Sequence, residues 1–515
     1  MSQRLFCLRA TWLARLFLCA GVSLASGCMV GPNYHRPVAI ASPRFKELQP
    51  LPGWQRATPA IAELDRGNWW GIYNDPVLDS LESQVVLSNQ NIKIAEANYR
   101  AARAIVDSAR SALFPTLSVA PGVTRSSSGI GSITSSGTSA ISSGGGSFTS
   151  STYSLQGTAD WDLDLWGRIR RQVESDVASA QASAADLANA TLSYQATLAA
   201  DYFDLRTQDS LQDLLDRTIA SYTRSLQITQ NQYDAGLTAA TPAALLQART
   251  QLETTRAESI NVGVLRAQYE HAIAVLTGLP PASLALAPAP LASFVPPIPV
   301  SLPAVMLQRR PDIAAAERAM EQENALIGVQ VAAFYPDVSL SAAYGWSGNP
   351  IGSLIQASNR VWSLGASATE ILFEGGLRSA AIEQARAQYD SAVATYRQTV
   401  LGAFQSTEDE LSNLRILARQ ADAQARAVAL AEEAVTVSLN EYRAGTTDYT
   451  TVVTSQITAL SNEQTALNIQ QQRLIDSVAL IQQMGGGWRD TDLPSKNSLQ
   501  TNNPLIPSFL ENSHP

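Results

Sequence analysis

Tyr233-Asp-Ala-Gly236-Leu-Thr238 recurs 209 residues later as Tyr442-Arg-Ala-Gly445-Thr-Thr447, and Gln247 and Gln456 follow the two copies at the same offset. Upstream, residues at alternating spacings of three and four also match: Ile219, Tyr222, Leu226, Thr229 and Tyr233, then Val428, Ala431, Val435, Ser438 and Tyr442. This spacing is typical of a coiled-coil seam. Farther upstream, Phe114-Pro115 corresponds to Tyr335-Pro336 at an offset of 221, so the first copy holds twelve extra residues. The chain is therefore a tandem duplication.

Two very long stretches have helical composition, rich in Ala, Gln, Leu, Glu and Arg. Residues 170–235 contain no proline, and at ~1.5 Å per residue they predict a helix of roughly 100 Å. A second helix of similar length is predicted for residues 378–444, and shorter helices for residues 76–113, 242–276, 312–333 and 447–484. Pro242 and Pro311 lie near helix starts, where a missing N–H is harmless. Gly236 and Gly445 are expected to end the long helices, which then turn into antiparallel partners.

Each half also carries segments with two-residue periodicity, apolar on one face and polar on the other, which indicates strands. In the first half the apolar set is Tyr153, Leu155, Gly157, Ala159, Trp161, Leu163 and Leu165, alternating with Thr152, Ser154, Gln156, Thr158, Asp160, Asp162 and Asp164. In the second half the apolar sets are Val338, Leu340, Ala342, Tyr344 and Trp346, then Trp362, Leu364, Ala366 and Ala368. A fourth segment, Leu117 to Thr124, is weaker because Pro121 interrupts it.

This pattern is the one expected of transmembrane barrel strands, with apolar side chains toward lipid and polar ones toward the lumen. An amphipathic sheet of a soluble domain is the alternative. Residues 126–151 are almost all Ser, Gly and Thr, and we predict a long exposed hairpin loop there. That loop accounts for the extra residues of the first half.

Four strands cannot close into a barrel, and an open sheet edge cannot face lipid. If the strands span a membrane, the chain must therefore oligomerise. A dimer would give eight strands with an interior filled by side chains, whereas a trimer would give twelve and leave a passage. The polar strand faces and the 100 Å helices favour a trimeric, water-filled tube.

The N-terminus predicts export and lipidation. Arg4, Arg9 and Arg15 precede an apolar stretch that ends in Leu24-Ala25-Ser26-Gly27-Cys28, a secretory signal with a lipobox. The other two cysteines lie inside the signal, so an exported chain cannot form an internal disulfide, and we interpret Cys28 as an acylation site. An ordinary signal with a chance cysteine is the alternative. Met29 follows, where an inner-membrane retention signal would place Asp, so outer-membrane delivery is favoured.

Composition excludes several functions. The only histidines are His35, His271 and His514, far apart in sequence, so a His/Cys metal site or a Cys–His nucleophile is not expected. We find no phosphate-binding loop, dinucleotide fingerprint or nucleophile elbow, and expect no catalytic residue and no cofactor. Without the three arginines of the signal, 33 basic and 45 acidic side chains give a formal charge of −12, which disfavours nucleic-acid binding. No apolar run after the signal is long enough for a transmembrane helix.

Several motifs together carry a resemblance over nearly the whole mature chain. They are Cys28-Met-Val-Gly-Pro32-Asn-Tyr34-His-Arg36-Pro37, Asp75-Pro76-Val-Leu78, Trp161-Asp-Leu-Asp-Leu-Trp-Gly167-Arg168, Leu307-Gln-Arg309-Arg310-Pro311-Asp312-Ile313 and Gly485-Gly-Gly-Trp488. In this order they resemble the NodT-type lipoprotein branch of outer-membrane efflux factors, which are related to TolC. The resemblance implies an α+β membrane protein that forms a homotrimer. Four transmembrane strands per chain would make a twelve-stranded barrel, continued by a periplasmic barrel of twelve coiled-coil helices.

The resemblance also implies partners and a location. The chain would be lipid-anchored in the outer membrane of a Gram-negative bacterium through N-terminal acyl chains. It would work with a periplasmic adaptor protein and an inner-membrane transporter, commonly of the resistance-nodulation-division (RND) class. Together they would export drugs or toxic compounds.

In this family the two helix-turn-helix tips form the periplasmic entrance, which gates the duct and docks the adaptor. The candidate positions here are Tyr233 and Gly236 at the first tip, and Tyr442, Gly445 and Thr446 at the second. Seam packing for the tyrosines and helix capping for the glycines is the alternative.

The inner side of the second tip departs from related channels. Where those channels place an acidic ring, this sequence has Thr450 and Thr454, with Asp448 the only nearby carboxylate. Threonines neither repel anions nor titrate. We therefore expect hydrogen bonds and packing to hold the closed gate.

Other features receive more limited interpretations. Asp160, Asp162 and Asp164 are candidates for a cation-attracting lumen wall, although a wet wall needs polar side chains in any case. Trp161 and Trp166 are candidate interfacial anchors. The predicted divisions are a signal peptide (1–27), a lipidated N-terminal segment (28–75), a first repeat (76–278), a linker (279–303), a second repeat (304–488) and a flexible tail (489–515).

Other functional classes explain less of the sequence. A passive porin or adhesin would not need two 100 Å helices per chain. A soluble coiled-coil scaffold would leave the lipobox and the strands unused. An enzyme is the least expected class, because no set of catalytic residues can be assembled.

Overall fold

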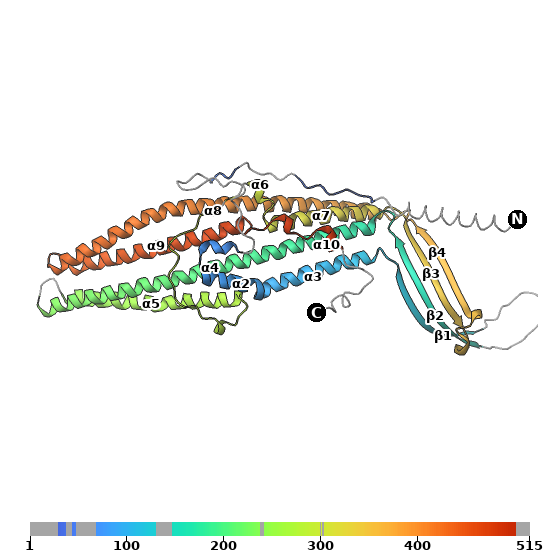
Figure 1. The fold of residues 1–515 in the computed structure, drawn as a ribbon, viewed down its shortest axis with the longest axis horizontal. Helices are drawn as coiled ribbons and strands as arrows, with labels where there is room; N and C mark the ends of the chain where they lie inside the picture. The colour runs from blue at the N-terminus through green and yellow to red at the C-terminus, as the bar shows by residue number, and fades with distance from the viewer. Residues whose placement is uncertain are drawn as a thin grey trace, which may run out of the picture.

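The computed structural model describes residues 29–37, 44–47, 68–129, 147–236, 241–298, 300 and 303–500. Its elements repeat in order: a helix, two strands, a very long helix and a shorter antiparallel helix (Figure 1). In the first half these are α3 (Gln90–Ser111), β1 (Thr116–Gly129), β2 (Ser147–Leu163), α4 (Arg168–Asp234) and α5 (Pro242–Leu276). In the second half they are α7 (Pro311–Ala332), β3 (Asp337–Gly348), β4 (Arg360–Thr369), α8 (Leu377–Arg443) and α9 (Tyr449–Gln483).

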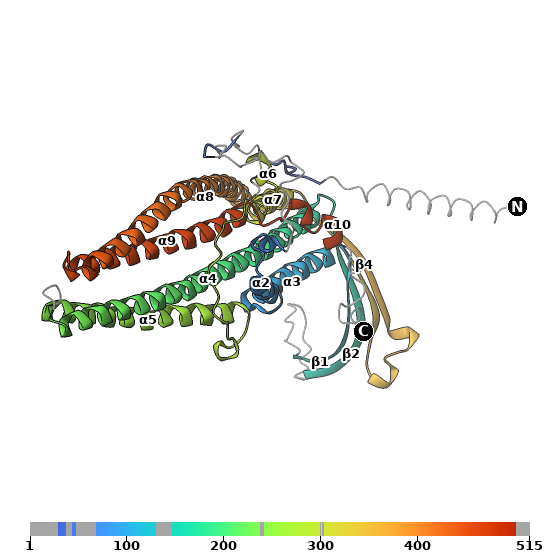
Figure 2. The same cartoon turned by 60° about the vertical axis from the view of Figure 1, so that its left-hand side comes forward.

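The two long helices match their predictions closely. α4 and α8 each contain 67 residues, which corresponds to about 100 Å. Gly167 and Gly376, at their N-termini, have φ of +84° and +89°, a conformation that glycine adopts at little cost and that turns the chain from the sheet region into the helix. The hairpins α4–α5 and α8–α9 extend to one end of the molecule, and the strands lie at the other (Figures 1 and 2).

The helix predicted for residues 76–113 is instead two helices, α2 (Pro76–Ser88) and α3, separated by Asn89. The Asn89 side chain accepts hydrogen bonds from the backbone N–H groups of Asn91 and Ile92, and donates one to the carbonyl of Leu276 at 2.8 Å. Asparagine favours this N-cap arrangement. The sequence pattern missed the break because the apolar periodicity continues through it.

The strands form one antiparallel sheet in the order β1-β2-β3-β4. Pro121 does not interrupt β1, where it lies opposite Leu155, because an edge strand tolerates a proline. The predicted loop over residues 126–151 is too long. Pairing continues to Gly129 and resumes at Ser147, since backbone ladder bonds do not depend on apolar side chains. Residues 130–146 lie outside the description.

The largest hydrophobic core lies where an N-terminal segment crosses the helices. Trp69 and Trp70, in the 3-10 helix η1 (Trp69–Tyr73), are 1% and 3% exposed. Tyr73 packs edge-to-face on Phe203 of α4, with ring centroids 5.0 Å apart. The Tyr73 hydroxyl also lies 2.6 Å from that of Ser477 on α9. This core therefore joins the two repeats midway along the helices.

The connection between the repeats is fixed to the first one. Arg206 of α4 donates to the Asp209 carboxylate at 2.9 Å and to the carbonyl of Ala287 at 2.7 Å. Arg266 of α5 donates to the same carboxylate at 2.7 Å. The short elements η2 (Pro281–Ser283) and α6 (Pro303–Met306) lie in and after this connection.

The structure describes the tail, which is predicted to be flexible, as far as residue 500. It contains η5 (Asp490–Asp492) and α10 (Lys496–Leu499). Leu499 is 5% exposed and packs with Val106 and Val173. Gln181 donates to the carbonyl of Pro494 at 2.8 Å. One buried leucine and a few polar contacts therefore attach this polar segment to the helices. Residues 501–515 lie outside the description.

Candidate functional site

The tips of both helical hairpins end their long helices with a glycine, as predicted. Gly236 and Gly445 have φ of +75° and +74°. At the second tip the N–H of Gly445 donates to the carbonyl of Tyr442, and that of Thr446 to the carbonyl of Glu441, each at 3.0 Å. These bonds satisfy the last carbonyls of α8, and the positive φ favours glycine. Both glycines therefore act as helix caps.

Tyr442, a candidate gate or docking position, is buried within the protomer. It is 0% exposed and packs on Tyr449 with ring centroids 5.3 Å apart. Its hydroxyl donates to the Thr229 hydroxyl at 3.3 Å, and its carbonyl accepts from the Gln232 side chain at 3.3 Å. Tyr442 therefore binds the second tip to α4 of the first repeat, as expected of a seam residue.

The repeat partner of Tyr442 has a different environment. Tyr233 is 42% exposed, although its position in the motif is the same. At the first tip the seam is continued by Gln232, which is buried. Tyr233 is therefore one of the few aromatic side chains open to a partner at this end of the protomer.

The other candidate tip positions are exposed: Gly236, Gly445, Thr446, Asp448, Thr450 and Thr454. Asp448 is at the N-cap position of α9, but its side chain makes no cap hydrogen bond. The Thr454 hydroxyl donates to the carbonyl of Thr450 at 2.9 Å. Thr454 therefore offers only acceptor lone pairs to a neighbouring protomer.

A second buried contact joins the hairpins farther from the tips. The side-chain amide of Gln456, on α9, donates to the Ser225 hydroxyl, on α4, at 2.9 Å. Gln456 is 3% exposed. The contact between the repeats near the tips therefore combines aromatic packing with a few buried hydrogen bonds.

At the other end of the molecule the sheet has two distinct faces. On the polar face the hydroxyl oxygens of Ser118 and Thr158 lie 2.7 Å apart across β1 and β2. Those of Ser339 and Ser367 lie 2.8 Å apart across β3 and β4. Asp160 and Asp162 are exposed on β2. The opposite face carries the large apolar side chains, many of them exposed in the protomer. This is the amphipathic arrangement predicted for strands between lipid and a lumen.

Asp164 does not belong to this polar wall, contrary to the prediction. Its side chain is 9% exposed and accepts hydrogen bonds from the backbone N–H groups of Ile169 and Arg170, both at 3.0 Å. The Arg170 side chain also donates to it at 3.0 Å. Asp164 lies just after β2, where the alternating pattern ends, and it holds the first turn of α4.

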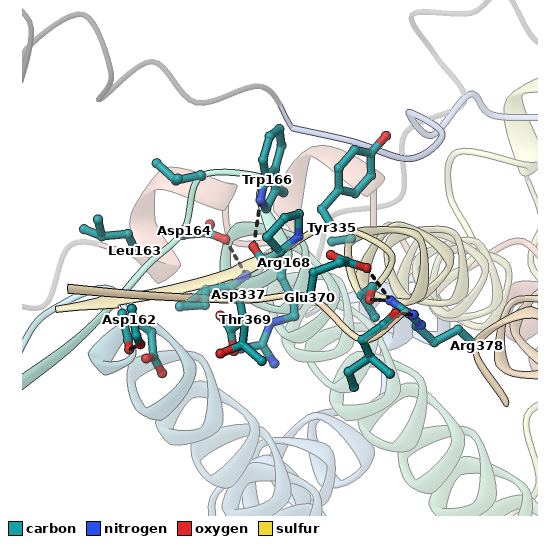
Figure 3. A pocket seen from close by; sticks show the side chains of 18 residues that line it. Asp162, Leu163, Asp164, Trp166, Arg168, Tyr335, Asp337, Thr369, Glu370 and Arg378 are labelled. Atoms are coloured by element: carbon teal, nitrogen blue, oxygen red, sulfur yellow. Dashed lines mark hydrogen bonds and ion pairs between the residues drawn. The ribbon is translucent and has the colours of Figure 1, made fainter. Parts of the chain in front are cut away.

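A pocket of about 450 Å³ lies at this junction between sheet and helices (Figure 3). Charged side chains line it: the acidic residues Asp162, Asp337 and Glu370 and the basic residues Arg168 and Arg378. Arg378 pairs with Glu370 at 3.2 Å, and Arg168 lies 3.9 Å from Asp337. These cross-element pairs fix the sheet on the helices, and the sequence alone did not predict them.

Residues 29–37 are held by several hydrogen bonds at the same junction. Arg171, whose side chain is 1% exposed, donates to the carbonyls of Val30 and Gly31 at 3.1 and 3.2 Å and to Asn33 at 2.8 Å. Val30 donates to the carbonyl of Trp166 at 3.1 Å. We call residues 29–37 the N-terminal strap. Cys28 itself lies outside the described residues.

Several carboxyl groups inside the helical part have raised pKa values, and in three of them the increase is large. Burial raises the pKa of Glu82 to about 9. Burial and the Asp204 carboxylate raise that of Asp201 to about 6. Burial and the Asp476 carboxylate raise the pKa of Glu410 to about 7. No sequence pattern distinguishes these three groups, because acidic residues on helices usually face solvent.

Within the described ranges, no group of His, Cys, Asp and Glu side chains is arranged to hold a metal ion. None of the helices in those ranges is both long and apolar enough to cross a membrane.

The fold and the two ends together define a class of protein: one protomer of an oligomeric duct, with an amphipathic sheet at one end and two helical hairpins at the other. The chain belongs to the outer membrane efflux protein family, whose pattern matches residues 81–279 and 302–486.

The chain is similar to known relatives and to solved structures over nearly its full length. The probable efflux pump outer membrane protein TtgC of Pseudomonas putida is 28% identical over 474 residues, which are 92% of this chain and 95% of TtgC. The outer-membrane channel OprN is 28% identical with a TM-score of 0.80, covering 90% of this chain and 100% of OprN. The open state of the MtrE channel of Neisseria gonorrhoeae is 25% identical with a TM-score of 0.77, covering 91% and 100%.

These similarities confirm the predicted fold class and the function that follows from it. The chain is an outer-membrane channel component of an efflux pump, and it has the fold of TolC-like trimeric channels, with a β-barrel and long helices that extend into the periplasm.

Proposed function

We propose that this chain is the outer-membrane duct of a tripartite pump. A periplasmic adaptor would dock on the exposed tip residues, and an inner-membrane transporter of the RND class would deliver the cargo. The observation that carries this proposal is the contrast at the tips between buried Tyr442 and its exposed surroundings, which include Thr446, Asp448 and Tyr233. A surface of this kind, at the end farthest from the sheet (Figure 2), is open to a partner.

The closed gate would be held by packing and hydrogen bonds rather than by charge. The Tyr442–Thr229 and Gln456–Ser225 contacts hold the second hairpin on the first. Thr450 and Thr454 supply no titrating group. Opening would require these contacts to separate, because they bridge the two hairpins of one protomer.

Site-specific photocrosslinking tests the docking surface. A photoreactive residue at Thr446 or Tyr233 should capture a co-expressed adaptor. One at Arg217, whose side chain is 69% exposed but which lies about 25–30 Å from the tip along α4, should not. Equal capture at all three positions would reject docking at the tips.

The cargo would be small toxic molecules, such as drugs or solvents. Relatives named as efflux proteins for antibiotics and toluene support this class. Asp160 and Asp162 would face the lumen and raise the local concentration of cations. Asparagine at both positions should lower the cation preference of the channel, and an unchanged preference would reject this role.

We also propose that residues 1–27 are removed and that Cys28 is acylated. The position of the N-terminal strap supports this, because Met29 contacts Gly167 just beyond the end of β2. An anchor there would enter the membrane beside the barrel. The mass of the N-terminal peptide tests the proposal directly: acyl chains on Cys28 are expected, and an unmodified thiol would refute it.

A further inference from the structure

The apolar face of the sheet contains a groove of about 550 Å³ across its central strands. Small residues form the floor: Gly157 and Ala159 on β2, and Ala342 on β3. A Cβ added at Gly157 would meet only the carbonyl oxygens of Tyr344 and Ser118, at 3.7 and 3.8 Å. The space above the floor is therefore open.

Large apolar side chains on the outer strands flank this floor. In the register of the sheet, Leu117 of β1 and Leu364 of β4 lie in the same row as Ala159 and Ala342. These two leucines are 79% and 77% exposed, and Trp362 in the next row is 69% exposed. The groove is therefore apolar on its floor and on both sides.

The surroundings of the groove in the membrane point to hydrocarbon as its occupant. The opposite face is the polar one, so the groove faces lipid, where water is excluded. The free edges of the sheet, at which neighbouring protomers can pair, are β1 and β4. The groove lies over β2 and β3, so no neighbouring strand covers it.

The mature N-terminus lies beside the ends of the same two strands that are nearest the helices. Trp166, just after β2, stacks on Tyr335, just before β3, with ring centroids 4.8 Å apart. Met29 contacts Gly167 beside this pair. Leu163, Trp166 and Tyr335 lie on one side of the strands and Asp162 on the other (Figure 3). Because Leu163 continues the apolar face, the strap reaches the sheet on the lipid side.

The depth of the groove suits an acyl chain that starts at this level. Ala159 and Gly157 are four and six residues above Leu163 on β2, or about 13–20 Å along the strand. Strand tilt shortens this distance to roughly 10–15 Å along the membrane normal. One leaflet of a ~30 Å hydrocarbon core covers this depth.

We propose that one acyl chain of Cys28 lies in the groove of its own protomer, between Gly157, Ala159 and Ala342; this inference rests on the acylation proposed above. The chain is tethered below the groove, so its effective concentration there exceeds that of loose lipid chains. The anchor would thus be part of the barrel surface and would not extend freely into the bilayer.

The test uses the full-length protein from cells fed a fatty acid with a photoreactive diazirine. After exchange into vesicles of unlabelled phosphatidylethanolamine, the probe remains on the anchor and on any labelled phospholipid that stays bound to the protein. Illumination and peptide mass mapping should place its adducts on the groove residues of β2 and β3. Gly157→Leu, which fills the groove, should lower these adducts about tenfold. Ala342→Leu fills it from β3, in case Gly157→Leu does not assemble.

Val123→Leu is the matched control, because Val123 is 68% exposed on the same face but outside the groove. It should leave the adducts unchanged. Adducts spread evenly over the apolar face, or unaffected by the filling variants, would overturn the groove site while leaving acylation intact. Adducts with the mass of a whole phospholipid would assign the groove to surrounding lipid. An N-terminal peptide without acyl chains would refute the acylation, and the inference with it.

Discussion

The hydroxyl of Tyr442 donates to that of Thr229 at 3.3 Å, and this contact joins the second helical tip to the long helix of the first repeat. Thr229 belongs to the seam of the first repeat and Tyr442 to the equivalent seam of the second. The two repeats are offset by 209 residues. The duplicated motif therefore does more than build two similar hairpins. It supplies the residues that hold one hairpin against the other.

Removing the buried ring should loosen the closed tip. Tyr442→Ala is expected to cost the tip about 3–5 kcal/mol, as for other buried aromatic residues, and Tyr442→Phe only about 0.5–1.5 kcal/mol. Open probability in single-channel recordings should rise strongly for the first variant and little for the second. Tyr233→Ala removes the exposed repeat partner and should leave the recordings unchanged. Equal effects of Tyr233→Ala and Tyr442→Ala would contradict the packing role.

The threonines of the second tip should make the gate insensitive to acid. Thr450→Asp together with Thr454→Asp would place six carboxylates in the trimer, which repel each other above their pKa values near 4. We expect this variant to prefer cations at pH 7 and to lose the preference near pH 4, as measured by reversal potentials in a salt gradient. Asp448→Asn should stay closed. A leaky Asp448→Asn, with silent alanine substitutions at Thr450 and Thr454, would show that charge holds the gate.

Glu410 should make stability fall as pH rises. Burial and Asp476 raise its pKa to about 7, above the ordinary value of ~4.3. At pH values between these two pKa values the folded state binds more protons than the unfolded state. The stabilising contribution of Glu410 is therefore complete below the unfolded-state pKa and is lost as the pH rises to the folded-state pKa. Glu410→Gln should therefore stabilise the protein at pH 8, on the order of 1–2 kcal/mol, and hardly at pH 4. Thermal unfolding in detergent at both pH values measures the difference.

For Glu410, the neighbouring Asp409 provides a matched control. It is exposed and lies on the same helix, so Asp409→Gln should have a much smaller effect at pH 8. An identical pH profile for Glu410→Gln and the unmodified protein would rule out this buried proton.

The N-terminal strap should depend on one glycine. Gly31 has φ of +93°, and a Cβ there would lie 2.5 Å from the Cα of Gly328. Gly31→Ala should therefore detach the strap and expose residues 29–37 to proteolysis. Gly263→Ala is the control, since its Cβ meets nothing within 4 Å; it should leave the strap protected and favour its helix by about 1 kcal/mol. Equal protease resistance of both variants would show that the strap does not need this close approach.

The regular elements could be predicted because their signals are local. An uninterrupted helical pattern gave the two long helices to within a few residues, and alternation gave the strands through Trp161 and Trp346. The predictions differ from the structure where contacts between distant segments determine the local conformation. Asn89 separates two helices, caps the second and bonds to Leu276, and Leu499 of the polar tail packs on Val106. Neither partner is visible from the local sequence.

The site was predictable only in part for the same reason. The motif identified both tips, and the glycine caps follow from backbone conformation alone. The motif could not distinguish Tyr233 from Tyr442, because their environments differ through the other hairpin. Asp164 fits the alternating pattern but lies one residue beyond the strand, where helix capping takes over.

The most direct test of the central claim is single-channel conductance of the purified protein in a planar bilayer, with its mass determined in the same preparation. A gated trimeric duct predicts a trimer that is mostly closed and that Tyr442→Ala opens. A monomer, or a pore that stays open and is unaffected by Tyr442→Ala, would contradict the account.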